Sequence, residues 1–93
     1  MNNIKIVYFN TETINKVSLE SLLFSNANSI SHYEIKSGLF LINFKGTARE
    51  LYALVENVVN ENSILIHDLD ADENAYWGFM NKDIWEWLKN NRL

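Results

Sequence analysis

The stretch GTARELYALVENVV, residues 46–59, decides the fold. It begins with Thr47, a good helix cap, and Glu50 three residues on completes the pattern of a capping box. Apolar residues then recur at spacings of three and four, at Leu51, Leu54, Val55, Val58 and Val59. This pattern predicts a helix over residues 48–60.

The chain before this helix has the pattern of a β-hairpin. Residues 30–36 and 39–44 are two strand-like runs, and Ser37 and Gly38 separate them. Glycine supplies the positive φ that a tight hairpin turn demands, so we expect two antiparallel strands here.

A strand and a helix are expected before the hairpin. Residues 4–9 are β-branched and aromatic, and the polar turn 10–13 closes them. Residues 15–25 are predicted to form a short helix behind an asparagine cap, with apolar positions at Val17, Leu19, Leu22 and Leu23.

A fourth strand and a last helix are expected after residues 60–62. Residues 63–69 are apolar on both faces at their start, as in an interior strand. Asn81 is a suitable cap for a helix over residues 82–90. Its buried stripe is predicted to hold Ile84, Trp87 and Leu88, with Trp85 beside it.

The order of these elements predicts an α+β fold, a ferredoxin-like βαββαβ sandwich with an added C-terminal helix, in a single domain over residues 1–93. The first two helices should cover one face of an antiparallel four-stranded sheet. The expected core consists of Ile6, Tyr8, Leu41, Phe44, Leu51, Leu54, Val55, Val58, Leu65, Trp87 and Leu88. The other face needs the last helix or a second subunit to cover it, so we expect a homodimer.

Composition argues against several classes of protein. Twelve acidic and eight scattered basic residues give a net charge of −4, a poor basis for nucleic-acid binding. The chain has no cysteine, which excludes disulfides and thiolate catalysis and favours a cytoplasmic location. The longest apolar run, residues 39–42, is too short for a membrane span, and residues 1–4 do not resemble the start of a secretion signal. Nucleotide-binding glycine loops and a nucleophile elbow are absent, so no cofactor is expected.

Three segments resemble a known family. They are NSILIHDL at residues 62–69, YWGF at 76–79 and IWEWLKN at 84–90. The segments resemble the C-terminal half of small bacterial proteins related to the CRISPR adaptation nuclease, the Cas-two-like or SinR-like group. The likeness covers residues 30–91, and it implies a ferredoxin-like fold and a two-fold dimer.

The same resemblance implies a nuclease alternative. In that family an aspartate ends the first strand, and two subunits bring a pair of carboxylates to a divalent metal. This chain has Asn10 there, which lacks the negative charge that a hard cation needs. The other acids near strand ends are Glu12 and the group from Asp68 to Asp72. They would follow antiparallel strands, which separates them within one subunit.

One acidic cluster comes after the fourth strand, with Asp68, Asp70, Asp72 and Glu73. It fails the calcium-loop pattern, because Glu73 stands where that loop has glycine and Phe79 where it has glutamate. We therefore expect a solvated patch that docks on a basic protein partner, and no metal site.

Aromatic residues follow the cluster and extend the predicted docking surface to Tyr76, Trp77 and Trp85. Trp85 and Trp87 are about 200° apart on a helix, so one should be in the core and the other at the surface. The two histidines, His32 and His67, are expected to be partly buried strand residues rather than metal ligands.

These patterns together predict a non-catalytic interaction protein. It would be either a degenerate relative of the adaptation nuclease acting as a homodimer or an acidic inhibitor or immunity-type protein. A metal-dependent nuclease acting on RNA or DNA is the alternative.

Overall fold

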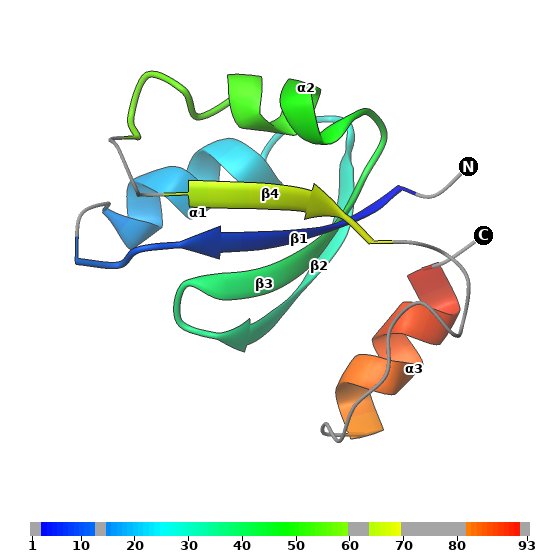
Figure 1. Cartoon of the computed structure of the whole chain (residues 1–93). Coiled ribbons are helices and arrows are strands. Elements are labelled where there is room, and N and C mark those ends of the chain that lie inside the picture. The colour runs from blue at the N-terminus through cyan, green and yellow to red at the C-terminus, as the bar shows by residue number, and fades with distance from the viewer. Residues whose placement is uncertain (1–2, 13–14, 60–63, 70–81, 92–93) are drawn as a thin grey trace.

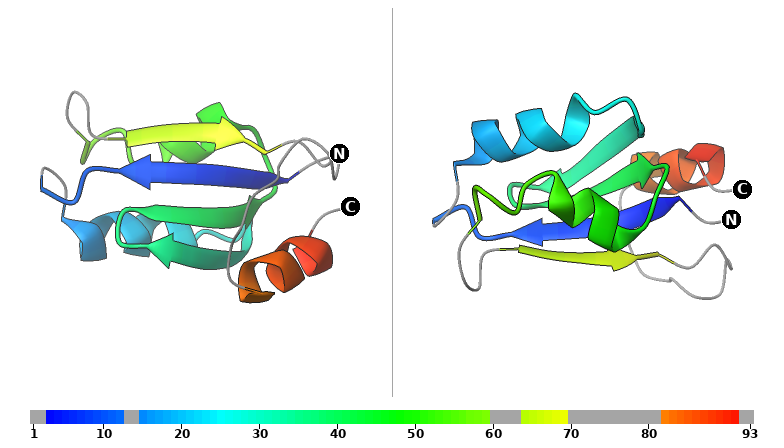
Figure 2. Two further views of the ribbon diagram at one scale, coloured as in Figure 1. Left: turned by 60° about the horizontal axis from the view of Figure 1, so that its bottom comes forward. Right: turned by 90° about the horizontal axis from the view of Figure 1, so that it is seen from above.

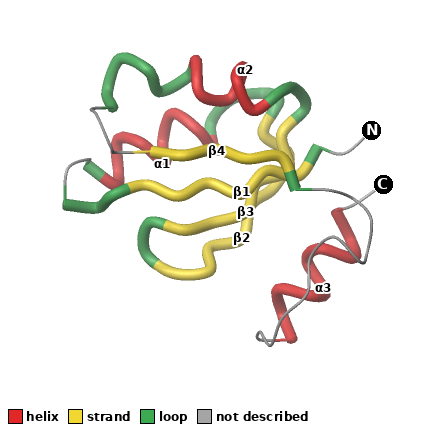
Figure 3. Tube along the Cα trace, viewed as in Figure 1, coloured by secondary structure: helices red, strands yellow, loops and turns green. Residues whose placement is uncertain are grey.

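The computed structural model describes residues 3–12, 15–59, 64–69 and 82–91. Within these ranges the chain forms an α+β fold with four strands and three helices (Figures 1 and 3). In chain order they are β1 (Ile4–Phe9), α1 (Lys16–Phe24), β2 (Ser29–Lys36), β3 (Leu39–Phe44), α2 (Ala48–Ala53), β4 (Ile64–Asp68) and α3 (Lys82–Asn91).

The strands form one antiparallel sheet in the order β2-β3-β1-β4. β1 is an inner strand, with Tyr8 opposite Leu39 of β3 on one side and Leu65 of β4 on the other. β4 lies at the edge, so the expectation of an interior fourth strand is wrong. The apolar residues on the two faces of β4 lie in different surroundings, because helices cover only one face of the sheet at this strand.

The β2–β3 hairpin confirms the turn predicted from Ser37 and Gly38. Gly38 has a φ of 88°, in the region that favours glycine. A Cβ atom at this position would lie 2.6 Å from the carbonyl oxygen of Phe9, so the turn also needs the space that glycine leaves.

The α1 helix begins after the predicted asparagine cap. The side chain of Asn15 accepts a hydrogen bond from the backbone N–H of Ser18 at 3.1 Å. Leu19 and Leu23 are buried, whereas Val17 and Leu22 are exposed. The helix therefore packs through a stripe narrower than its four apolar residues suggest.

The capping box at the start of α2 is confirmed. The Thr47 hydroxyl accepts from the Glu50 N–H, and the Glu50 carboxylate accepts from the Thr47 N–H, each at 3.0 Å. The helix ends at Ala53, well before the predicted end at residue 60. Beyond it the N–H groups of Leu54, Val55 and Val58 donate to carbonyls three residues back, so the backbone tightens into turns.

We expect the capping box to weaken in acid. The Thr47 N–H, and then its hydroxyl, hold the pKa of Glu50 below its ordinary value of 4.5. A carboxylate with a lowered folded-state pKa stabilises the fold above its unfolded pKa, and this contribution is lost as pH falls through the folded value. Denaturant unfolding from pH 7 to pH 2 should therefore show a loss of stability below about pH 4.5 that is smaller in Glu50→Gln.

Glu56→Gln is the matched control for this experiment, because Glu56 is an exposed carboxylate in the turns after α2. It should leave the acid loss unchanged. Identical pH profiles for the wild-type chain and both variants would contradict the assigned role of Glu50.

The two faces of the sheet pack against different helices (Figure 2). α1 and α2 cover one face, as the sequence predicted, and their cluster consists of Val7, Phe9, Leu19, Leu23, Phe40, Ile42, Phe44, Leu51 and Val55. α3 lies on the opposite face, where Ile84 and Leu88 pack with Ile4 and Leu41. Its further apolar neighbours include Tyr33 and Ile35 of β2.

Three residues of the expected core are exposed instead: Tyr8, Val58 and Leu65. Val58 lies in the turns after α2, where the helical face is lost. Tyr8 and Leu65 face the side of α3 but lie near the β4 edge, whereas α3 packs toward β2 and β3. Leu41, Phe44, Leu51, Val55 and Leu88 are buried as predicted, and Ile6, Leu54 and Trp87 are partly buried.

A polar network holds the end of α3 to the sheet. The Asn91 side-chain oxygen accepts from the Ser31 hydroxyl at 2.5 Å and from the Asn43 amide at 3.1 Å. The Asn91 amide donates to the Trp87 carbonyl at 2.8 Å. The helix position is therefore set by directional bonds as well as by apolar contact.

Candidate functional site

Asp68 is the one member of the predicted acidic patch that lies within the described residues. It ends β4, and its carboxylate is 3.1 Å from the Lys5 ammonium. The rest of the predicted docking surface before α3 lies outside the described residues: Asp70, Asp72, Glu73, Tyr76 and Trp77. The charge of Asp68 is partly neutralised by Lys5, which weakens its value as a docking group.

Lys5 is a buried cation that the sequence analysis missed. Its side chain is 1% exposed, on the face covered by α1 and α2, and its ammonium lies 3.5 Å from the carbonyl oxygen of Phe44. It also contributes to lowering the pKa of Glu50. The sequence feature that could have identified it is a lysine between Ile4 and Ile6, at a strand position whose side chain faces α1 and α2. The ion pair with Asp68 thus joins β1 to the end of β4.

The prediction that one tryptophan of α3 lies in the core and the other at the surface is wrong. Trp85 and Trp87 are both partly buried and both pack against the Ile84–Leu88 cluster. Trp87 lies near Tyr33, with ring centroids 6.5 Å apart. α3 places its two buried residues on the sheet and one tryptophan on each side of them, so Trp85 has a packing role in addition to any exposed edge.

Both histidines are exposed, which corrects the prediction that they are partly buried. His32 lies on the outer strand β2 and stacks on Phe24 of α1, with ring centroids 3.7 Å apart. His67 lies on β4, on the opposite sheet face. Within the described ranges, no three His, Asp or Glu residues gather closely enough to hold a metal ion.

The geometry expected for the acids near the strand ends is present. β1 and β4 run antiparallel, so Asn10 and Glu12 follow β1 at one end of the sheet while Asp68 lies at the other. Within one subunit these residues do not form a joint site.

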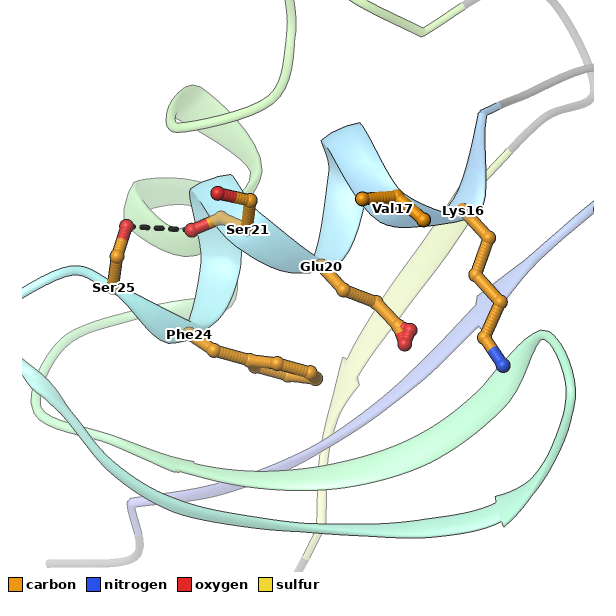
Figure 4. Close-up of a pocket in the computed structure, with 6 residues that line it drawn as sticks. All are labelled: Lys16, Val17, Glu20, Ser21, Phe24 and Ser25. Carbon is orange, nitrogen blue, oxygen red and sulfur yellow. Dashed lines mark hydrogen bonds between the residues drawn. The ribbon is translucent and has the colours of Figure 1, made fainter.

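A surface groove of about 630 Å³ runs beside α1 (Figure 4). Figure 4 shows Lys16, Glu20 and Phe24 on the side of α1 that faces the β2–β3 hairpin. Lys16 pairs with Glu34 of β2 at 3.1 Å, and this bond raises the pKa of Lys16 above its ordinary value. Lys16 of the groove is therefore already paired with the neighbouring strand. One oxygen of Glu20 is buried without a hydrogen-bond partner.

An uncovered apolar surface lies on the other face of the sheet. Tyr8 and Leu65 are directly opposite each other on β1 and β4, and they are 49% and 65% exposed. Ile6 and His67 form the next cross-strand pair on the same face; His67 is exposed, whereas Ile6 is partly buried against the cluster of α3. We call Tyr8, Leu65 and His67 the open face. It carries no carboxylate, lysine or arginine.

The open face adjoins an unpaired strand edge. The Leu69 N–H donates to the Ile4 carbonyl at 2.9 Å, so the backbone of Leu69 points toward β1. The N–H and C=O groups of successive residues in a strand point alternately to its two sides. Leu65 and His67 therefore also bond to β1. The remaining residues of β4 turn these groups outward; they are Ile64, Ile66 and Asp68. In the described part of the chain, no strand pairs with this outer side.

Comparisons with protein families, curated proteins and solved structures gave no match for this chain. Among the described helices, none has the length and apolarity to cross a bilayer. The surface features above are thus the basis for a proposal on function.

Proposed function

We propose that this chain is a non-catalytic interaction protein that works as a homodimer and uses the open face as its interface. The observation that carries the proposal is the exposure of Tyr8 and Leu65 side by side on the part of the sheet face that α3 leaves uncovered. Exposed large apolar residues that adjoin one another are typical of protein interfaces, and tyrosine is favoured there.

A second copy is favoured over a strongly charged partner by the chemistry of the open face. None of its residues, Tyr8, Leu65 and His67, is an acid, a lysine or an arginine. Two chains of net charge −4 repel each other at long range, so contact between them is best made where charge is absent. The acidic docking patch remains a prediction, to be tested with Asp70→Lys combined with Asp72→Lys.

We also propose a ferredoxin-like assignment for the sheet. It is supported by the positions of β3 between β1 and β2, and of β1 between β3 and β4. Each helix α1 and α2 thus joins two parallel strands across a third, which is the split βαβ arrangement. The kinship with relatives of the adaptation nuclease is a further proposal, and it rests on the sequence likeness over residues 30–91.

We expect the wild-type chain to have about twice its 10.9 kDa mass in size-exclusion chromatography with light scattering at micromolar concentration. Leu65→Lys should shift it to the monomer mass, because it places an ammonium in the apolar interface. Leu65 is 65% exposed in one chain, so the substitution should leave the fold and its circular dichroism unchanged.

Leu22→Lys is the matched control, since Leu22 is also an exposed leucine but lies on α1, on the opposite side of the sheet. It should remain dimeric. A monomeric wild-type chain at all concentrations would refute the proposal, and so would metal-dependent cleavage of RNA or DNA that Asp68→Ala or Glu12→Ala abolishes.

A further inference from the structure

We infer that α3 is a detachable cover of its sheet face. It undocks and unfolds as one unit while the sheet with α1 and α2 stays folded, and its departure uncovers an apolar row that runs across the sheet into the open face. The inference concerns the single chain and does not rest on the proposed homodimer. It follows from the contacts that hold α3, from the length of α3 and from the residues beneath it.

The apolar contact of α3 with the sheet is small. Among the described residues, the cluster beneath α3 has four buried members, whereas the cluster beneath α1 and α2 has nine. Two of the four, Ile84 and Leu88, come from α3 itself. Apolar stabilisation grows with the buried area, and the regions with the fewest buried contacts are the first to open. Undocking of α3 should therefore need less free energy than unfolding of the sheet.

The polar network at the end of α3 contains an unsatisfied group. Asn43 is 7% exposed, and its side-chain oxygen has no hydrogen-bond partner, although its amide donates to Asn91 of α3. A buried acceptor without a partner costs free energy, and water that reaches Asn43 after α3 has left relieves this cost. The network thus fixes the position of α3 while it lowers the stability gained by docking.

The length of α3 couples docking to helix formation. The helix has ten residues. Isolated helices shorter than about 12–15 residues are marginal in water, and the exposed Lys82–Glu86 pair at 3.5 Å adds little. An undocked α3 therefore loses its helix, so the segment has two states, docked and helical or undocked and unfolded.

The residues beneath α3 belong to a cross-strand row that continues beyond the helix. Tyr33 of β2 pairs with Leu41 of β3, Leu41 with Ile6 of β1, and Ile6 with His67 of β4. The first three residues of the row pack in the cluster of α3, whereas His67 is exposed in the open face. Figure 2 shows α3 on the β2 and β3 side of the sheet, away from β4. The position of α3 therefore sets how much apolar surface the sheet offers to a partner.

Thiol labelling tests this device, since the chain has no cysteine of its own. Leu41→Cys places a thiol beneath α3. Ile42→Cys is the matched control, because Ile42 is the next residue of β3, is equally buried and lies beneath α1 and α2. Under native conditions the Leu41→Cys thiol should react at least about tenfold faster, because opening of α3 exposes position 41 and leaves position 42 covered. Denaturant unfolding of each variant corrects the two rates for global stability.

A second pair of variants assigns the opening to α3. Added to Leu41→Cys, Asn91→Ala should speed labelling about fivefold, because it removes hydrogen bonds that hold α3 to the sheet. Asn90→Ala, at an exposed neighbouring position of the same helix, should leave the rate unchanged. Equal corrected rates at positions 41 and 42 would overturn the inference, and so would an Asn91→Ala effect of the same size at both positions.

Backbone hydrogen exchange of the wild-type chain provides a measurement that needs no cysteine variant. The hydrogen-bonded amides of α3 should share one protection factor, at least about tenfold below those of β1 and β3, because the helix opens as a unit. Protection in α3 equal to that of β1 would contradict the detachable cover. A gradual fall of protection along α3 would mean that the helix frays from one end, and it would contradict opening as a unit.

Discussion

Replacing Phe40 by alanine is expected to lower the free energy of unfolding by about 3–5 kcal/mol, enough to unfold a large share of a domain of this size. Phe40 is 1% exposed and lies in the centre of the layer under α1 and α2. Its ring makes edge-to-face contacts with Phe24 and Phe9, at centroid distances of 5.0 and 6.1 Å. The substitution therefore removes apolar burial and leaves a cavity between β1, β3 and α1.

Urea denaturation followed by tryptophan fluorescence measures this effect. Tyr52→Ala is the control, because Tyr52 is an aromatic residue on α2 that is 37% exposed, and its loss should cost less than half as much. Equal losses for the two variants would mean that Phe40 is not at the centre of the core.

The second large effect is expected at the Lys5–Asp68 ion pair. Asp68→Asn removes the carboxylate that faces a buried ammonium, and we expect a loss of about 1–3 kcal/mol in unfolding free energy. The loss should be below that of a fully buried pair, because Asp68 is itself 56% exposed. Lys5→Met replaces the buried ammonium by an apolar chain of similar length, so it should cost less than Asp68→Asn.

A double-mutant cycle separates the energy of the Lys5–Asp68 interaction from the effects of the two residues on their other contacts. In the Lys5→Met background, Asp68→Asn should have almost no effect, because no buried charge remains to be compensated. A loss in that background as large as in the wild-type chain would mean that Asp68 stabilises the fold through other contacts. Denaturant unfolding of the four chains at pH 7 provides the measurement.

The parts of the fold that depend on neighbouring residues could be predicted from the sequence. The Thr47–Glu50 capping box needs residues three apart, and the turn at Gly38 needs one residue with a positive φ. The Asn15 and Thr47 caps and the hairpin are therefore confirmed, while the predicted Asn81 cap lies outside the described residues. The end of α2 was predicted wrongly, because apolar residues at helical spacing also suit the successive turns that follow Ala53.

The parts that depend on strand order could not be predicted in the same way. Ile64 and Ile66 face the helix-covered side while Leu65 faces the open side, and an apolar run looks the same in an edge strand and an interior one. Whether Tyr8 is buried depends on where α3 lies on the sheet, which short-range patterns do not encode. Two residues of the candidate interface, Tyr8 and Leu65, consequently belong to the core expected from the sequence.

In the candidate site, too, residue types could be predicted from the sequence, but contacts between distant strands could not. Asp68 was selected for its charge among neighbouring acids, but its distance to Lys5 follows from pairing strands 63 positions apart in sequence. The sequence identified the chemical types of residue at the end of β4 without indicating which of them are already paired.

The central place of β1 in the sheet has a consequence for how the chain is made. β1 ends at Phe9, but its neighbours β3 and β4 end at Phe44 and Asp68. At about 5–20 residues per second, several seconds of synthesis separate the first strand from the strands that flank it. β1 is therefore synthesised before either of the strands that flank it, and β4, at the edge of the sheet, is the last of the four strands to be translated.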